Sequence, residues 1–137
     1  MESKIKVLTA EDRGRYEEFM KSLELLEDEE IKLIYPCWMP SPLFYIGYLI
    51  FTNYNMMFLH SEPNLEQPQK ILQIPINQIT GVKDRKRRLT EHITVITQVK
   101  KTKKVYDFGV FTGFLKDREA PSNARKVANE IESLIEK

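Results

Sequence analysis

The sequence has few of the features on which disulfide-rich and membrane-spanning proteins depend. Its one cysteine, Cys37, excludes an internal disulfide framework and is typical of a reducing compartment. Its longest apolar stretch, LFYIGYLIF, is about half as long as the roughly twenty residues that a transmembrane helix needs. The N-terminal MESKIKVLTAEDR contains no apolar signal segment. We therefore expect an intracellular, soluble protein, and its 137 residues fit one domain.

Groups that carry out catalysis are scarce as well. The two histidines, His60 and His92, have no cysteine or carboxylate at ligand spacing, so we expect them to be solvated or structural. Cys37 lacks the flanking signature of a nucleophile and is expected to be a structural thiol. The five glycines form no phosphate-binding loop. The sequence therefore predicts no enzyme, no catalytic residue, no metal site and no cofactor.

What the sequence has in quantity is charge, and the sign of that charge changes along the chain. The net charge is +1, but residues 1–30 carry ten acidic and five basic side chains, whereas residues 83–104 carry two acidic and nine basic ones. The basic residues fall into two groups: Lys83, Arg85, Lys86, Arg87 and Arg88, and then Lys100, Lys101, Lys103 and Lys104. Such a segment projects a local positive field that a partner can detect.

Hydrophobic spacing predicts a helix, about seven short strands and a second helix. The first helix is expected from about Ala10 to Leu26, capped by Thr9, with an apolar face of Tyr16, Phe19, Met20 and Leu23. The second is capped by Ser122 and carries an apolar stripe that includes Val127, Ile131 and Leu134. The expected strands span residues 31–35, where Pro36 ends the strand, and then 44–53, 55–60, 70–76, 79–83, 92–100 and 103–111. Short strands joined by turns indicate a small antiparallel sandwich or barrel.

Three stretches resemble the GRAM-type branch of the pleckstrin-homology superfold: EDEEIKLIYPCWM, GYLIFTNYNMMFLHS and ILQIPINQITGVK. In that family an acidic turn leads into the first strand, a G-x-L-x-x-T-N-x-x-x-x-F run makes the next hairpin, and an I-P-I-x-x-I-x-x-V run makes the next strand pair. The matching positions are Gly47, Leu49, Thr52, Asn53 and Phe58, followed by Ile74, Pro75, Ile76, Ile79 and Val82. With the VYDFGVF strand and the final helix, the resemblance covers residues 27–137.

The resemblance implies an α+β, mainly β fold: a partly open, seven-stranded antiparallel barrel of the pleckstrin-homology type, capped by the C-terminal helix. The N-terminal helix is additional to that fold. We therefore expect residues 1–26 to form an amphipathic helix packed on, or extending, a domain of residues 27–137. In function, the resemblance implies a non-enzymatic adaptor that recruits a protein or a membrane surface.

The basic residues of both groups are the candidate site for an anionic lipid or an acidic partner. Arginine matches phosphate or carboxylate oxygens bidentately, and juxtaposed residues could each gain about 1 kcal/mol near an anionic bilayer. The alternative is a solvated hairpin. A second candidate is the loop with Trp38, Met39, Leu43 and Phe44, whose apolar side chains could insert into a membrane or a partner's groove. Core packing is the alternative for these aromatic residues.

A protein is the expected principal partner, and an anionic membrane to which the protein attaches peripherally from the cytoplasm is the second. Many lipid-binding pleckstrin-homology domains have basic residues between their first two strands, but the corresponding CWMPSPLF has none, so a phosphoinositide site of the usual kind is not expected. The K-x-R-K-R-R pattern also fits nucleic-acid or nuclear-import binding, although no aromatic stacking platform interleaves it. A purely structural scaffold is the remaining alternative.

Overall fold

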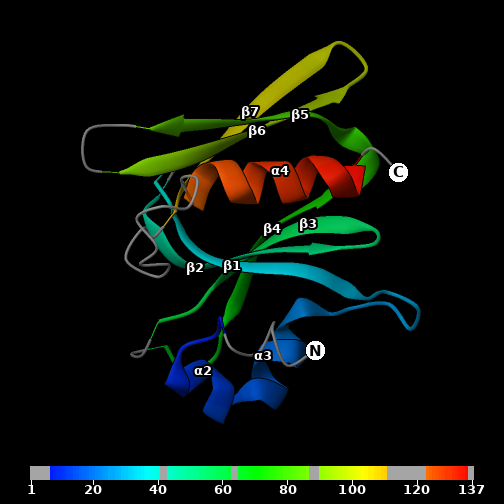
Figure 1. Cartoon of the computed structure of the whole chain (residues 1–137). Helices are drawn as coiled ribbons and strands as arrows, with labels where there is room; N and C mark the ends of the chain where they lie inside the picture. The colour runs from blue at the N-terminus through cyan, green and yellow to red at the C-terminus, as the bar shows by residue number, and fades with distance from the viewer. Residues whose placement is uncertain (1–6, 41–42, 63–64, 87–89, 111–122, 136–137) are drawn as a thin grey trace. The chain divides into compact units, whose positions relative to one another are not determined.

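Seven antiparallel strands make up most of the chain. The computed structural model describes residues 7–40, 43–62, 65–86, 90–110 and 123–135. The strands are β1 (Ile31–Met39), β2 (Tyr45–Thr52), β3 (Asn55–His60), β4 (Gln69–Pro75), β5 (Ile79–Lys86), β6 (Glu91–Val99) and β7 (Thr102–Val110). The helices are α2 (Ala10–Gly14), α3 (Tyr16–Leu23) and α4 (Asn123–Ile135), with a 3-10 turn, η1, at Ile76–Gln78 (Figure 1).

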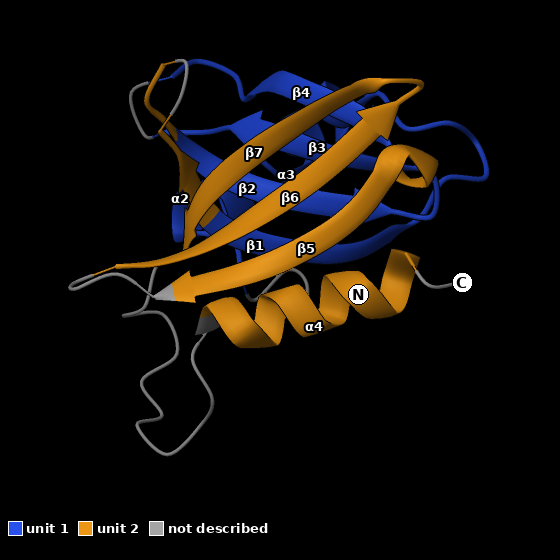
Figure 2. Cartoon of the chain, turned by 90° about the horizontal axis from the view of Figure 1, so that it is seen from above, with its two compact units in different colours: residues 1–36, 46–75 blue, residues 37–45, 76–137 orange. Residues whose placement is uncertain are grey.

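The strands form one open sheet in the order β4-β3-β2-β1-β7-β6-β5. The expected mainly β fold, with seven antiparallel strands and a helix at each end of the chain, is therefore confirmed. The chain divides into two compact units: residues 1–36 and 46–75 form the first, and residues 37–45 and 76–137 form the second (Figure 2). None of the described helices combines the length and apolarity needed to cross a bilayer.

In the first unit, the apolar face of α3 packs on the strands. Phe19 and Leu23 are fully buried in one cluster with side chains of β2 and β3, and Tyr16 and Met20 pack against that cluster. The ring of Phe19 meets that of Tyr48 edge to face, with 5.5 Å between their centroids. The face expected from the spacing of the sequence is therefore the buried one.

The expected single helix is instead two helices. The chain leaves helical geometry at Arg15, where φ is −118° and ψ is 40°, and α3 ends at Leu23 because Glu24 adopts the left-handed conformation. Gly14, a poor helix former, weakens the helix just before the break. The Arg15 guanidinium donates hydrogen bonds to the carbonyl oxygens of Glu62 and Leu65, and these contacts hold the chain at this corner.

In the second unit, α4 lies against β5 and β6 (Figure 1). Its buried residues are Ala124, Val127, Ala128 and Ile131, which recur at helical spacing. Inward-facing Ile93 and Val95 of β6 and Phe108 of β7 are buried on the same unit. The expected N-cap, Ser122, lies outside the described residues.

Two strands are longer than expected. Pro36 does not end β1, which continues to Met39, because the strand changes partners there: Cys37 and Trp38 pair with the end of β7. A proline lacks only a backbone donor, so a strand tolerates it where that donor is not needed. β5 likewise continues beyond Lys83 to Lys86, since its charged end pairs with the start of β6.

Candidate functional site

The first basic group begins within β5, not in a turn. Residues 83–86 belong to the strand, and the connection to β6 spans only residues 87–90. Alternation along a strand sends consecutive side chains to opposite faces. Lys83 and Arg85 therefore share one face, while Asp84 between them faces the other.

The register shows which face this is. Residues paired across antiparallel strands lie on the same face, and Asp84 pairs with buried Ile93 on the side of α4. The carboxylate of Asp84 accordingly lies 3.8 Å from the guanidinium of Arg125 in α4. Lys83 and Arg85 are exposed on the opposite face, which we call the outer face of β5.

Among the described residues, no carboxylate forms an ion pair with Lys83 or Arg85. The nearest acid in the strand register is Asp107 of β7. Lys83 pairs with Thr94, and Thr94 pairs with Asp107 of β7. The contacts described for the Asp107 carboxylate are with His92 at 3.0 Å and with Thr94 at 3.4 Å. The positive charge of the outer face is thus left for solvent or for a partner.

The two basic groups do not lie side by side. Lys100 and Lys101 form the turn between β6 and β7, and Lys103 and Lys104 open β7; all four are exposed. This turn lies at the end of β6 opposite to Glu91. In the register, Lys83 stands opposite Thr94 and Lys104 opposite Thr97, so at their nearest the two groups are three residues, or roughly 10 Å, apart along the strands. Consecutive turns of an antiparallel meander always alternate in this way. Arg87 and Arg88 lie outside the described residues, and for Lys86 only the backbone is described.

The apolar loop is divided between buried and exposed residues. Met39 is buried, whereas Leu43 and Phe44 are each 62% exposed. Trp38 lies over Gly109 so closely that a β-carbon at that glycine would stand 1.9 Å from the indole. The indole also meets the ring of His92 edge to face, with 5.8 Å between centroids. Two of the four expected insertion residues, Leu43 and Phe44, are therefore available to a partner.

The histidines belong to small hydrogen-bonded groups. His92 is buried, and its Nδ1 and Nε2 contact Asp107 and Thr90, each at 3.0 Å. The Nε2 of His60 lies 2.7 Å from the carboxylate of Glu62. In the described part of the chain no three metal-ligating side chains come together. Cys37 is buried, as expected for a structural thiol.

Two buried carboxylates in the first unit were not expected. Asp12 accepts hydrogen bonds from Ser61 at 2.5 Å, Tyr48 at 2.7 Å and Thr9 at 2.9 Å, and it pairs with Arg15 at 3.2 Å. Burial alone would raise the pKa of Asp12, but these donors together lower it below its usual value. Burial also raises the pKa of Tyr48 to about 12, so its hydroxyl remains a donor.

Glu29 is the second of these carboxylates. Burial opposes its charge, yet hydrogen bonds from Thr52, Asn55 and the backbone N–H of Leu26 lower its pKa. The partners described for each carboxylate all belong to the first unit. Both networks therefore stabilise the structure of that unit.

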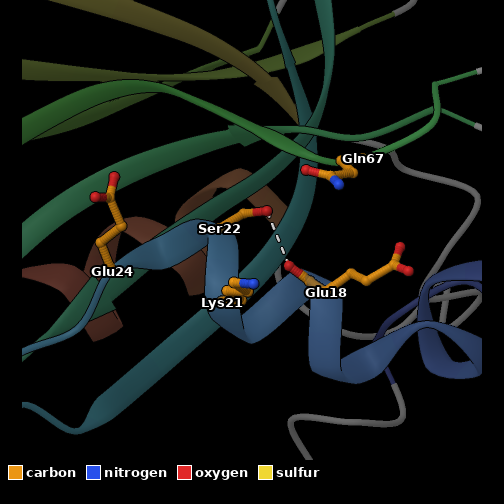
Figure 3. A pocket seen from close by; sticks show the side chains of 5 residues that line it. All are labelled: Glu18, Lys21, Ser22, Glu24 and Gln67. Atoms are coloured by element: carbon orange, nitrogen blue, oxygen red, sulfur yellow. Dashed lines mark hydrogen bonds between the residues drawn. The ribbon is translucent and has the colours of Figure 1, made fainter.

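A shallow pocket of about 540 Å³ lies beside α3 in the first unit (Figure 3). Its lining side chains are Glu18, Lys21, Ser22, Glu24 and Gln67. The Ser22 hydroxyl is already used, since it donates to the carbonyl oxygen of Glu18 at 2.8 Å. The lining carries charges of both signs, and none of these described side chains is a buried polar group directed into the pocket. The pocket therefore does not indicate a particular ligand.

Comparison with known proteins places this architecture among known folds. A family model described as GRAM domain matches residues 17–127. No curated protein matches the chain in sequence.

Two solved structures are similar in fold. The hSac2 domain from human phosphoinositide phosphatase Sac2 has a TM-score of 0.57 and 9% sequence identity, and the match covers 93% of this chain and 81% of that one. The complex of PDZ-RhoGEF DH/PH domains with GTP-gamma-S activated RhoA contains a chain with a TM-score of 0.55 and 11% identity, matched over 98% of this chain and 38% of that one. At such identities the likeness shows the fold alone, which is pleckstrin-homology-like.

Proposed function

Because the chain belongs to the GRAM domain family, we propose that it is a non-catalytic adaptor in the cytoplasm that binds a protein partner through the positive outer face of β5. The family and fold support a binding module of this general class. We infer the kind of partner and the surface that binds it from the side chains of the second unit.

One observation carries the proposal: Lys83 and Arg85 are exposed on one strand face and have no acidic partner among the described residues. They stand two residues apart on a strand, so their α-carbons are about 7 Å from each other. The partner that fits is therefore an acidic protein surface. Exposed ion pairs contribute only about 0.2–1 kcal/mol each, so charge here favours fast association and specificity over raw affinity.

Attachment to an anionic membrane is the second candidate, and the exposure of Leu43 and Phe44 favours it. Burying each of these side chains gains about 1.5–3 kcal/mol, and each basic residue near an anionic surface adds about 1 kcal/mol. Trp38, at the start of this loop, lies in the same cross-strand row as Arg85, through Gly109 and His92. Apolar and basic residues are thus present on one unit, as peripheral membrane binding requires.

The proposal is tested by affinity capture from cell lysate. The double variant Lys83→Ser, Arg85→Ser should fold normally but lose the proteins that the wild type captures. The matched control is Lys101→Ser, Lys103→Ser, which removes the same charge from the far end of β6 and should capture them as the wild type does. Equal capture by all three proteins would contradict the proposal. Binding to phosphatidylserine vesicles, lost in a Leu43→Ser, Phe44→Ser variant, would instead support the membrane.

A further inference from the structure

β5 is an edge strand whose second side is unpaired within the described chain. It ends the strand order, and its ladder joins it only to β6. Figure 2 shows β5 as the outermost of the three long strands of the second unit. An edge strand presents a row of unpaired N–H and C=O groups, which is a template for another strand.

The other edge of the sheet is less available. β4 ends in Pro75, and its pairing with β3 is irregular between Phe58 and Leu59. The Lys70 ammonium of β4 also donates to the carbonyl oxygen of Leu23, at the end of α3, at 3.0 Å. β5 has eight residues and contains no proline; α4 lies alongside it, and the side-chain contact described between them, from Asp84 to Arg125 at 3.8 Å, is on the inner face of the strand (Figure 2).

We infer that the free edge of β5 binds an extended acidic segment of the partner as an added strand. This inference rests on the proposed function and specifies how the partner would be recognised. Main-chain hydrogen bonds to β5 would supply affinity, and alternate side chains would supply specificity, as in other cases of strand addition.

The alternation on β5 defines the sequence that fits. Side chains of an added strand that face outward lie opposite Lys83 and Arg85, so acidic residues are favoured at two positions separated by one. The side chain between them faces inward, next to Asp84 and Arg125, whose opposite charges lie 3.8 Å apart, so this position favours neither sign of charge. The recognised pattern is thus two acidic residues separated by one residue of any kind.

The same charges exclude a second copy of the chain as the occupant. Two β5 edges placed together would set the positive residues of one copy near those of the other, and like charges in cross-strand positions are destabilising. Charge complementarity therefore favours an acidic strand over self-association.

Two peptides of equal composition test this inference on the full chain. One alternates aspartate and threonine over the eight residues of β5; the other, the control peptide, has the order Asp-Thr-Thr-Asp-Asp-Thr-Thr-Asp, in which no two aspartates are separated by one residue. The alternating peptide should bind the wild type about tenfold more tightly than the other peptide. This difference in affinity should disappear in the Lys83→Ser, Arg85→Ser variant and remain in the Lys101→Ser, Lys103→Ser variant. Amide hydrogen exchange should slow along β5 when the alternating peptide is bound.

N-methylation separates strand pairing from simple charge attraction. In an added strand, alternate N–H groups point toward β5, so methylating one alternate set should abolish binding and methylating the other set should leave it unchanged. If the alternating and control peptides bind equally and neither methylation matters, strand addition is refuted while an acidic partner remains. If no acidic peptide binds but phosphatidylserine vesicles do, both the strand addition and the acidic partner are refuted.

Discussion

At the scale of single residues, the carboxylate of Asp12 joins segments that are far apart in sequence. It accepts hydrogen bonds from the hydroxyls of Thr9, Tyr48 and Ser61, so the start of α2 is fastened to β2 and to the residue after β3. A buried carboxylate is unfavourable unless donors surround it. Here the donors more than offset burial, because the pKa of Asp12 is lowered.

Replacing Asp12 should therefore change how stability depends on pH. In the unfolded chain the pKa of an aspartate is about 3.9, and the lowered pKa in the folded state means that ionised Asp12 stabilises the fold above roughly pH 4. That contribution is lost as the pH falls through the folded-state pKa. Asp12→Asn should cost about 1–3 kcal/mol at neutral pH and flatten the acid side of the curve of unfolding free energy against pH.

Urea unfolding between pH 2.5 and 7 (roughly the range over which carboxylates titrate) provides the measurement. Glu17→Gln is the control, since Glu17 is exposed on α3 and its removal should leave the curve close to that of the wild type. An Asp12→Asn protein with the wild-type pH dependence would show that the network contributes nothing to acid stability.

A second prediction at this scale concerns the contact of Trp38 with Gly109. Gly109→Ala places a methyl group where the indole lies, so either the indole or the backbone of β7 must move. We expect a loss of about 1–3 kcal/mol in unfolding free energy, which circular dichroism in urea can measure. In Gly14→Ala the new methyl group meets nothing within 4 Å, and that variant should be as stable as the wild type or slightly more so. Equal stability of both variants would argue against the close packing of Trp38.

At the scale of elements, α4 is the clearest test of the second unit. Ile131 is fully buried on the side of α4 that contains Val127 and Ala128. Ile131→Asp would bury an unpaired charge and should cost more than about 4 kcal/mol. Ser133→Asp introduces the same side chain at an exposed position two residues later and should change stability by less than about 0.5 kcal/mol. Thermal unfolding of the two variants at the same temperature would contradict the packing of α4.

Elements also show what sequence patterns could and could not predict. The alternation of HITVITQVK and the apolar run before Asn53 are local signals, and they predicted β6 and β2 to within about one residue. The end of β5 carries no such signal, because Asp84, Arg85 and Lys86 look like a charged turn. Their strand conformation comes from pairing with His92 and its neighbours, which is a non-local effect.

The same limit applies to the candidate site. Thr9 could be recognised as a helix cap, but nothing local indicated that Asp12 would meet side chains 36 and 49 residues away. The basic groups were visible from composition, whereas their separation required the register of β6. That separation follows from hairpin geometry once the strands are known, so it could have been predicted.

We propose, further, that residues 1–26 are an integral part of the first unit, since Phe19 and Leu23 lie in its core.

At the scale of the whole molecule, both units are assembled from discontinuous segments. The first ends at residue 75, whereas the second needs residues 37–45 together with 76–137. During synthesis at about 5–20 residues per second, the ribosome needs several seconds more to make the remaining part of the second unit. Through that interval the first unit has its complete sequence, while the segment with Cys37, Trp38 and Met39 lacks β7, with which Cys37 and Trp38 pair. The nascent chain thus exposes this apolar segment before its partner strand exists, and this is the stage at which a chaperone would have most to protect.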